Sequence, residues 1–253
     1  MDIAVTGAAG RVGREAIDAL SGHDVTAITH REHDDIESVV ADLSDRETLA
    51  ATFRGTDVVV HLAADSNSSA TWESVLGTNI DGTRTVYEAA LEADVRRVVF
   101  ASSNHTTGMY NIADPTERGT MTKGDVAVVD PTDPPRPDGF YGVSKVAGEA
   151  LGSFYADRHG VEVVNLRIGW YLTREELRET LSGDPERGRF ARALWLSPED
   201  CRQVVRQCVC SDIPENPLTI HAISANDDRY VTLTPTIQAI DYRPEANSAA
   251  VDP

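Results

Sequence analysis

The apolar positions of this chain form short continuous runs that alternate with longer amphipathic stretches. The runs lie at residues 3–5, 25–28, 39–42, 58–63, 98–101 and 162–168. The stretches with helical periodicity lie at residues 12–20, 72–93 and 141–157. Strands that are buried on both faces have near-continuous apolar sequences. The alternation therefore predicts an α/β fold, with a doubly wound parallel sheet covered by helices on both sides.

Two parts of the chain interrupt this pattern. Residues 110–139 are rich in Pro, Asp and Gly and are too long for an ordinary connection, which is typical of a flap over an active site. Residues 170–192 are charged and punctuated by glycine. The remaining expected elements are a helix at 198–210, a strand at 218–223 and a helix at 235–240. We expect a main domain at 1–169, a small substrate-covering segment at 170–245 and a disordered tail at 246–253.

The first apolar run leads directly into Gly7, Gly10 and Gly13, at the start of an expected helix. Glycines at this spacing permit a tight turn and the close approach of a phosphate, which side chains would prevent. The N-terminus of the following helix presents free N–H groups and a partial positive charge to a pyrophosphate. The strand–loop–helix context therefore predicts a Rossmann-type dinucleotide site in which these glycines bind the cofactor.

The residues after the second apolar run indicate which dinucleotide binds. NAD sites usually place an acidic side chain there, on the ribose 2′-hydroxyl, whereas this chain has His30 and Arg31 before its first carboxylate, Glu32. Arg31 is well placed to meet a 2′-phosphate, with help from Arg11 in the glycine loop. We therefore predict a preference for NADP. The alternative is that Arg31 is solvated and that Glu32 or Asp34 reaches the ribose.

The composition narrows the classes of partner. A formal net charge of −18 argues against nucleic acid, and acidity combined with a lysine count of only two is typical of a high-salt cytoplasm. No apolar run reaches the roughly 18 residues of a membrane span. The first residues already have a strand pattern, so we expect no signal peptide and a cytoplasmic protein. Cys201, Cys208 and Cys210 lack the spacing of metal ligands, so we expect reduced thiols and no metal.

Tyr141 and Lys145 are four residues apart in an expected helix and therefore share one of its faces. A lysine ammonium can lower the pKa of a nearby phenol from about 10 toward neutrality, which would make Tyr141 a usable base. Ser103 follows the apolar run at 98–101, and doubly wound sheets bind ligands outside the carboxyl ends of their strands. The Ser103 hydroxyl can hydrogen-bond the reacting oxygen, so we expect Ser103, Tyr141 and Lys145 to be catalytic.

The chain resembles the extended short-chain dehydrogenase/reductase family over essentially the whole length of the chain, and several segments carry the resemblance. They are TGAAGRVG at 6–13, ADL at 41–43, HLAA at 61–64, TNIDGT at 78–83, ASSNHTTG at 101–108, YGVSK at 141–145 and RIG at 167–169. The resemblance implies that Lys145 also holds the ribose hydroxyls and that Asn79 positions a proton-relay water. The further cofactor-binding residues that it implies are Ala9, Val12, Asp42, Leu43, Leu62, Ala63, Ala64, Asn79, Tyr141 and Ile168, together with His30.

Within this family, Ser103-Asn104-His105 is similar to the uronate dehydrogenase branch and to related aldose and hexose-phosphate dehydrogenases of salt-loving archaea. These enzymes oxidise the anomeric carbon of a pyranose sugar to a lactone. In uronate dehydrogenases an arginine before the Trp-Leu-Ser segment binds the substrate carboxylate, whereas Arg189 and Arg192 lie near that segment here at altered spacing. The substrate contacts that the resemblance implies are Ser66, Ser103, Asn104, His105, Tyr141 and Arg192.

These observations predict an NAD(P)-dependent sugar 1-dehydrogenase acting on a neutral aldose such as L-arabinose, D-xylose, D-galactose or D-glucose. A uronate or glucose-6-phosphate dehydrogenase of the same branch stays open. A nucleotide-sugar epimerase or dehydratase is a further alternative, although little chain follows Gly169 to grip a nucleotide diphosphate. The third alternative is a non-catalytic module that binds NADP without turnover. The resemblance also implies a homo-oligomer, a dimer or tetramer built on the helices at 72–93 and 141–157.

Overall fold

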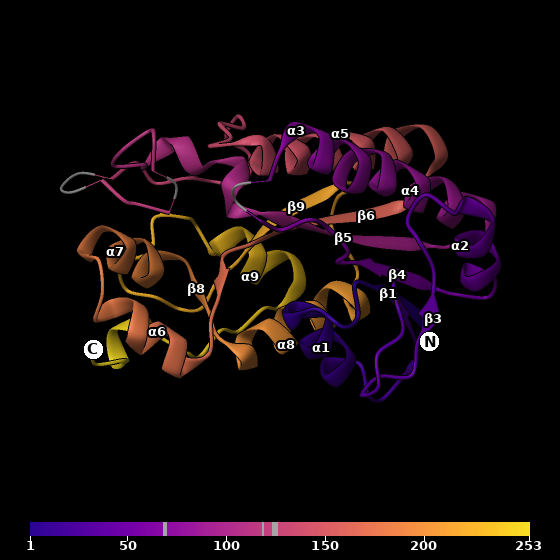
Figure 1. The fold of residues 1–253 in the computed structure, drawn as a ribbon, viewed down its shortest axis with the longest axis horizontal. Helices are drawn as coiled ribbons and strands as arrows, with labels where there is room; N and C mark the ends of the chain where they lie inside the picture. Colours follow the sequence, from indigo (N-terminus) through magenta and orange to yellow (C-terminus); the bar gives the residue numbers. More distant parts are fainter. Residues whose placement is uncertain (68–69, 118, 123–125) are drawn as a thin grey trace.

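The structure, a computed structural model, describes residues 1–67, 70–117, 119–122 and 126–253. Its centre is a seven-stranded parallel sheet in the order β3-β2-β1-β4-β5-β6-β9 (Figure 1). The strands are β1 (Asp2–Thr6), β2 (Asp24–Thr29), β3 (Val39–Val40), β4 (Val58–His61), β5 (Arg97–Ser103), β6 (Glu162–Ile168) and β9 (Leu218–Ala222). The strand order reverses between β1 and β4, which is where open sheets of this kind bind ligands. The expected doubly wound fold is confirmed.

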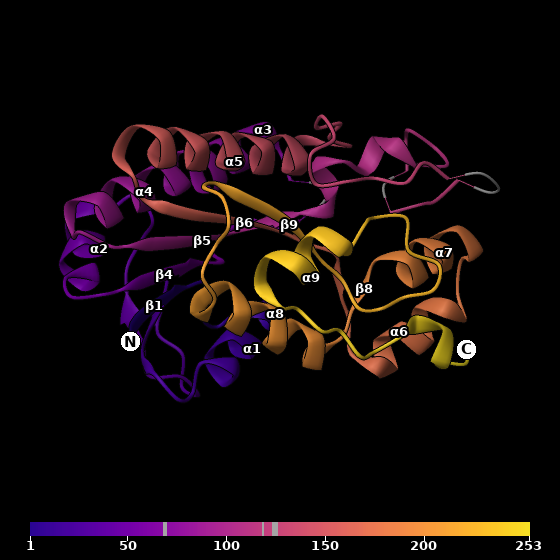
Figure 2. The same ribbon diagram turned by 180° about the vertical axis from the view of Figure 1, so that it is seen from behind.

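Alternate residues of the central strands supply two separate cores. In β1, Ile3 and Val5 belong to one buried cluster, whereas Ala4 belongs to the other. Val60 and Val59 of β4 divide in the same way, because successive side chains of a strand point to opposite faces. One face is covered by α1 (Arg11–Ala19) and α8 (Pro198–Cys210), and the other by α2 (Arg46–Phe53), α4 (Gly82–Glu92) and α5 (Phe140–His159) (Figures 1 and 2).

Several helices differ from the sequence prediction. The helix expected at 72–93 begins as α3 (Trp72–Ser74), widens into a π-helix at Val75–Asp81 and continues as α4. Three further helices, α2, α6 (Arg174–Leu181) and α7 (Pro185–Leu194), were not predicted because they are short and, in α6 and α7, highly charged. Their N-terminal caps are local: Asp45 caps α2, Thr173 caps α6 and Asp184 caps α7. No helix in the described part of the chain is long and apolar enough to cross a membrane.

The boundary expected at residue 169 does not separate the sheet from the rest of the chain. Strand β9 pairs with β6 in the central sheet, and α8 packs against α1, although both follow residue 169. The part that lies beyond the sheet consists of α6, α7 and a small parallel pair, β7 (Trp170–Tyr171) with β8 (Trp195–Leu196). In Figure 1 this part lies at the end of the molecule opposite the N-terminus. This part, residues 170–196, is called the cap below.

The expectation of a disordered tail at 246–253 is wrong. Ser248 and Val251 are buried, and Val251 packs against Leu177 of the cap. The backbone N–H of Ser248 donates to the Asn226 side chain at 3.0 Å, and its hydroxyl donates to the Arg192 carbonyl at 2.7 Å. The end of the chain therefore completes the small core of the cap. A sequence this short has no periodicity from which such packing could be predicted.

A buried histidine joins three elements at the point where the sheet reverses. His61, at the end of β4, hydrogen-bonds the Thr6 hydroxyl of β1 at 2.7 Å and the Thr83 hydroxyl of α4 at 3.1 Å. Burial lowers the pKa of His61 to about 3, and the nearby positive charge of Lys145 acts in the same direction. The ring is therefore neutral at physiological pH, with each nitrogen facing one threonine.

We predict that acidification destabilises the fold through His61. The unfolded chain protonates this ring near pH 6.5, whereas the folded chain does so only near pH 3. Between these values the unfolded state binds more protons, so the free energy of unfolding falls as the pH is lowered, by up to about 1.4 kcal/mol per pH unit. Denaturant titrations from about pH 7 to about pH 5 should show a shallower fall for His61→Gln than for the wild type.

The matched control is His159→Gln, which removes an exposed ring at the end of α5 and should keep the wild-type slope. The free energy of unfolding will still fall with decreasing pH in every variant, because burial also lowers the pKa of His221, to about 4. Equal slopes for the wild type and His61→Gln would contradict the assignment.

Candidate active site

The glycine loop after β1 lies against the loop after β4. Gly7 has a φ of 69°, and a Cβ there would lie 2.6 Å from the Ala63 backbone nitrogen. A Cβ at Gly13 would lie 2.3 Å from the Gly7 carbonyl oxygen, so neither position has room for a side chain. Gly10 begins α1 without a side-chain cap, which leaves the first N–H groups of the helix open. These features fit a dinucleotide pyrophosphate.

The other predicted cofactor residues follow the ends of neighbouring strands and therefore share one edge of the sheet. His30 and Arg31 follow β2, Asp42 and Leu43 follow β3, Leu62, Ala63 and Ala64 follow β4, and Ile168 ends β6; Ala9 and Val12 lie in the glycine loop and the first turn of α1. Arg31 is exposed, and in the described part of the chain its guanidinium has no ion pair or hydrogen bond. Asp42 accepts hydrogen bonds from the backbone and hydroxyl of Ser44, which lower the pKa of its carboxyl group.

Arg11 has a different partner from the one expected. Its guanidinium forms an ion pair with Glu176 of α6 and lies over the Tyr171 ring, 4.9 Å from the ring centroid. Tyr171 in turn donates a hydrogen bond to Glu15 of α1 at 2.6 Å. Arg11 therefore joins the glycine loop to the cap, and Arg31 is the arginine that stands free near the expected 2′-phosphate position.

The three predicted catalytic residues come together at the carboxyl edge of the sheet. Ser103 ends β5, Tyr141 lies in the first turn of α5, and Lys145 follows one turn later. The Lys145 ammonium lies 5.6 Å from the Tyr141 ring centroid and 5.0 Å from that of Phe100. Lys145 is 3% exposed, and among the described residues its ammonium has no hydrogen-bond or ion-pair partner. A buried cation without a partner fits the ribose hydroxyls of a bound dinucleotide.

The pKa values of this pair differ from the sequence prediction. Burial raises the pKa of Tyr141 to about 12, although a hydrogen bond from Ser103 lowers it. Burial lowers the pKa of Lys145 to about 7. The expectation that Lys145 brings the pKa of the Tyr141 phenol close to neutrality is not met, because desolvation favours the neutral forms of both groups.

The predicted sugar contacts Asn104 and His105 lie directly beside Ser103. Asn104 is buried, and its Nδ2 donor has no hydrogen-bond partner among the described residues. The backbone N–H of His105 donates to the Ser103 hydroxyl at 3.2 Å, and the His105 ring lies edge-on to Tyr141 with 5.7 Å between centroids. The site therefore offers two polar side chains next to the expected base.

Asp138 is a site residue that the sequence interpretation missed. Its carboxylate lies 2.7 Å from His105 Nδ1, and its side chain is only 3% exposed. A carboxylate accepts hydrogen bonds, so Nδ1 carries the proton and Nε2 is left to face a ligand. Asp138 lies three residues before Tyr141, in the segment of residues 110–139 that is rich in Pro, Asp and Gly and is called the proline-rich segment below. Its closeness to Tyr141 was the signal in the sequence that could have identified it.

Other predicted contacts are not brought into this constellation. Ser66 is exposed in the loop after β4. Asn79 is buried in the π-helix, where its amide bonds both backbone groups of Asp65 and the Ser144 hydroxyl, so it joins the β4 loop to α5. Arg192 donates to the Ser248 carbonyl at 3.0 Å, and Arg189 donates to the Met121 carbonyl at 3.4 Å.

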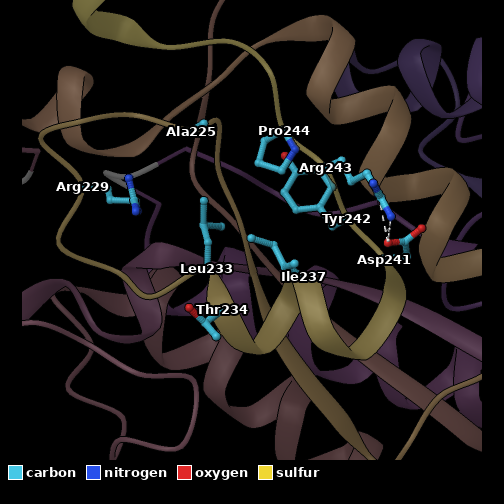
Figure 3. A pocket seen from close by; sticks show the side chains of 9 residues that line it. All are labelled: Ala225, Arg229, Leu233, Thr234, Ile237, Asp241, Tyr242, Arg243 and Pro244. Carbon is cyan, nitrogen blue, oxygen red and sulfur yellow. Dashed lines mark hydrogen bonds and ion pairs between the residues drawn. The ribbon is translucent and has the colours of Figure 1, made fainter.

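A surface hollow of about 480 Å³ lies apart from this site (Figure 3). Its lining comes from residues 225–244 and includes Tyr242 and the ion pair of Asp241 with Arg243. None of Ser103, Tyr141 or Lys145 lines it. The hollow is therefore not the cofactor site.

The glycine loop, the strand order and the serine, tyrosine and lysine define a dinucleotide-dependent enzyme fold, and sequence comparison shows its family. The chain belongs to the NAD dependent epimerase/dehydratase family, whose sequence profile matches residues 3–175. The resemblance stated from the sequence motifs is confirmed.

Two characterised relatives come from Haloferax volcanii. The chain is 57% identical to an L-arabinose 1-dehydrogenase (NAD(P)(+)), with 98% of each chain covered. It is 35% identical to an NAD-dependent glucose-6-phosphate dehydrogenase, covering 98% of this chain and 94% of that protein. Among solved structures, uronate dehydrogenase from Agrobacterium tumefaciens is 30% identical with a TM-score of 0.78, covering 98% of this chain and 86% of the other.

We predict that Lys145→Met weakens the binding of NADPH by about 10- to 100-fold, because a buried charged donor is lost. In the wild type the dissociation constant should rise as the pH passes above about 7, because Lys145 then loses its charge. This rise should be absent in Lys145→Met. Fluorescence titration of NADPH over this pH range measures both effects.

Tyr141→Phe is the matched control, because it keeps the aromatic ring beside Lys145 and should bind NADPH with nearly wild-type affinity. A Lys145→Met variant that folds and binds NADPH as tightly as the wild type would show that the ammonium does not contact the cofactor.

Proposed function

We propose that this protein is an NAD(P)-dependent sugar 1-dehydrogenase that oxidises the anomeric carbon of a neutral aldopyranose, with L-arabinose as the first candidate, to the lactone. The observation that carries the proposal is the group formed by Ser103, Tyr141 and Lys145. It lies next to the Asn104 Nδ2 donor, which has no partner among the described residues, and next to the His105–Asp138 pair. The high identity to an L-arabinose 1-dehydrogenase over the full length supports it.

The reaction needs a base for the C1 hydroxyl and an acceptor for the C1 hydride. A bound nicotinamide supplies the hydride acceptor. The Tyr141 phenolate takes the hydroxyl proton while the C1–H bond gives up its electron pair, so that the C1–O bond becomes the lactone carbonyl. The Ser103 hydroxyl donates a hydrogen bond to the same oxygen and holds it toward Tyr141. The charged form of Lys145 stabilises the phenolate, whose formation burial otherwise disfavours.

The neighbouring polar groups suit the remaining sugar hydroxyls. The orphaned Asn104 Nδ2 is a donor, and His105 Nε2 is an acceptor because Asp138 holds the ring proton on Nδ1. A sugar hydroxyl is both donor and acceptor and can satisfy both groups. A buried donor that has no protein partner is stabilised when a ligand supplies one.

We predict that the purified protein reduces NAD(P) with free L-arabinose and that Tyr141→Phe lowers kcat by at least about 100-fold, because proton transfer to a positioned base is lost. A panel of free aldoses, glucose 6-phosphate, a uronate and a UDP-sugar, assayed in molar salt by NAD(P)H absorbance, measures this. Turnover of glucose 6-phosphate alone would identify a glucose-6-phosphate dehydrogenase, and turnover of the uronate alone would identify a uronate dehydrogenase. Turnover of the UDP-sugar alone would identify an epimerase or dehydratase. Binding of NADPH without any turnover would identify a non-catalytic module.

The preference for NADP is a further part of the proposal. Arg31 is exposed and free beyond β2, whereas Arg11 is engaged with Glu176, so Arg31 is the cation available for a 2′-phosphate. We predict that Arg31→Ala lowers kcat/KM for NADP by about 10-fold and leaves that for NAD nearly unchanged. Steady-state kinetics with both cofactors measures this. A wild-type preference for NAD of more than about tenfold would contradict the assignment.

The surface of the α3–α5 helix pair favours assembly with a second copy of the chain. Trp72 of α3, Leu76 of the π-helix that follows it, and Phe140, Val143 and Phe154 of α5 are exposed. The centroids of the Trp72 and Phe140 rings lie 5.8 Å apart. Exposed apolar clusters of this kind are typical of interfaces between protein chains. We include a homo-oligomer in the proposal on this basis. A cytoplasmic location is also part of the proposal and is supported by the acidic, lysine-poor sequence.

A further inference from the structure

The cap places an aromatic ring beside the expected sugar-binding residues. The Phe190 ring of α7 lies with its centroid 6.3 Å from the His105 ring and 5.8 Å from the Trp170 ring. His105 itself contacts Tyr141, the expected base, at 5.7 Å. His105 therefore lies between the Phe190 ring of α7 and Tyr141, although Phe190 and Tyr141 are far apart in the sequence.

Phe190 is held firmly in this position. It is only 6% exposed and belongs to the same core cluster as Met121. Gly119 lies against its ring, since a Cβ at Gly119 would be 3.9 Å from Phe190 Cδ1. The cap and the proline-rich segment therefore meet at this phenyl group. The ring cannot move aside for a ligand without disturbing both segments.

The arginines on either side of Phe190 have other partners. Arg189 binds the Met121 carbonyl and pairs with Glu186, and Arg192 binds the Ser248 carbonyl of the C-terminal residues. Arg187 lies over the Trp170 ring at 4.8 Å. In the described part of the chain, none of these partners is His105. The contact of helix α7 with His105 is therefore made by the Phe190 ring.

We propose that Phe190 determines sugar specificity by forming the wall of the site at C5 of the pyranose ring, so that hydrogen is the only substituent that fits there. The inference rests on the proposed function, which places C1 at Ser103 and Tyr141. In an aldopentopyranose C2, C3 and C4 carry hydroxyl groups whereas C5 carries only hydrogen, so the C5 edge, which is joined to C1 through the ring oxygen, is the part of the ring that suits an apolar phenyl wall. A hydroxymethyl group would collide with the phenyl ring. A carboxylate would in addition lose water against the phenyl ring, and the neighbouring Arg187, Arg189 and Arg192 are engaged with other groups. The preferred substrate class is therefore an aldopentopyranose.

Three sugars with the same ring hydroxyl configuration isolate this position. L-Arabinose carries hydrogen at C5, D-galactose carries a hydroxymethyl group and D-galacturonate carries a carboxylate. We expect the wild-type kcat/KM for L-arabinose to exceed that for D-galactose by at least about tenfold and that for D-galacturonate by at least about 100-fold. In Phe190→Ala the ratio of D-galactose to L-arabinose should rise at least about tenfold, with an intermediate rise in Phe190→Leu.

The matched control is Phe53→Leu, which truncates a fully buried phenyl group in the core on the other face of the sheet and should keep the wild-type ratio. A folded Phe190 variant that lowers kcat/KM for both sugars by the same factor would overturn the inference, because the ring would then be merely structural. If Phe190→Ala fails to fold, Phe190→Leu and the wild-type ratios decide, and wild-type ratios within about threefold would also overturn it. Failure of the proposed function is distinct, because no free aldose would then be oxidised at all.

Discussion

The hydrogen bonds of one buried, neutral histidine, His61, connect β1, β4 and α4, and the rest of the site depends on how these elements are placed. His61 ties the end of β1 to α4 through Thr6 and Thr83. The Thr6 hydroxyl also accepts a hydrogen bond from the Ala63 N–H at 3.3 Å, which fixes the loops after β1 and β4 relative to each other. The close approach of Gly7 to Ala63, and with it the opening of the α1 N-terminus toward a ligand, depends on this arrangement. A ring that burial keeps neutral can make both bonds without an accompanying charge.

Two buried arginines outside the site form ion pairs with glutamates. Arg167 binds Glu149 through two hydrogen bonds of 2.8 Å, and Arg97 binds Glu162 and three backbone carbonyls. These pairs join β5, β6, α5 and α8. The Lys145 ammonium and the Asn104 Nδ2 group, by contrast, are buried and have no hydrogen-bond partner in the described part of the chain. Leaving such groups unpaired costs stability, and a ligand that pairs them recovers that free energy on binding.

The cap contributes to the site from a distance in sequence. Arg11 with Glu176, and Tyr171 with Glu15, connect it to the glycine loop and α1. The C-terminal residues close its small core through Ser248 and Val251. This packing carries Phe190 to His105. The glycine loop and the surroundings of His105 are therefore positioned by different sets of contacts. The first set lies within the sheet and its first helix, and the second lies between the cap, the proline-rich segment and the end of the chain.

The sequence by itself determined the doubly wound sheet, the glycine loop and the serine, tyrosine and lysine, because strand burial, helical spacing and tight turns each leave a local pattern. Helix α8 was predicted with its observed bounds for this reason. Only the tertiary structure decided the partners of Arg11 and Arg192, the role of Asp138, the position of Phe190 and the packing of the last residues. Each of these depends on contacts between distant segments, which no local periodicity encodes. The pKa values of Tyr141 and Lys145 belong to the same group, because they follow from burial, and the sequence shows spacing but not depth.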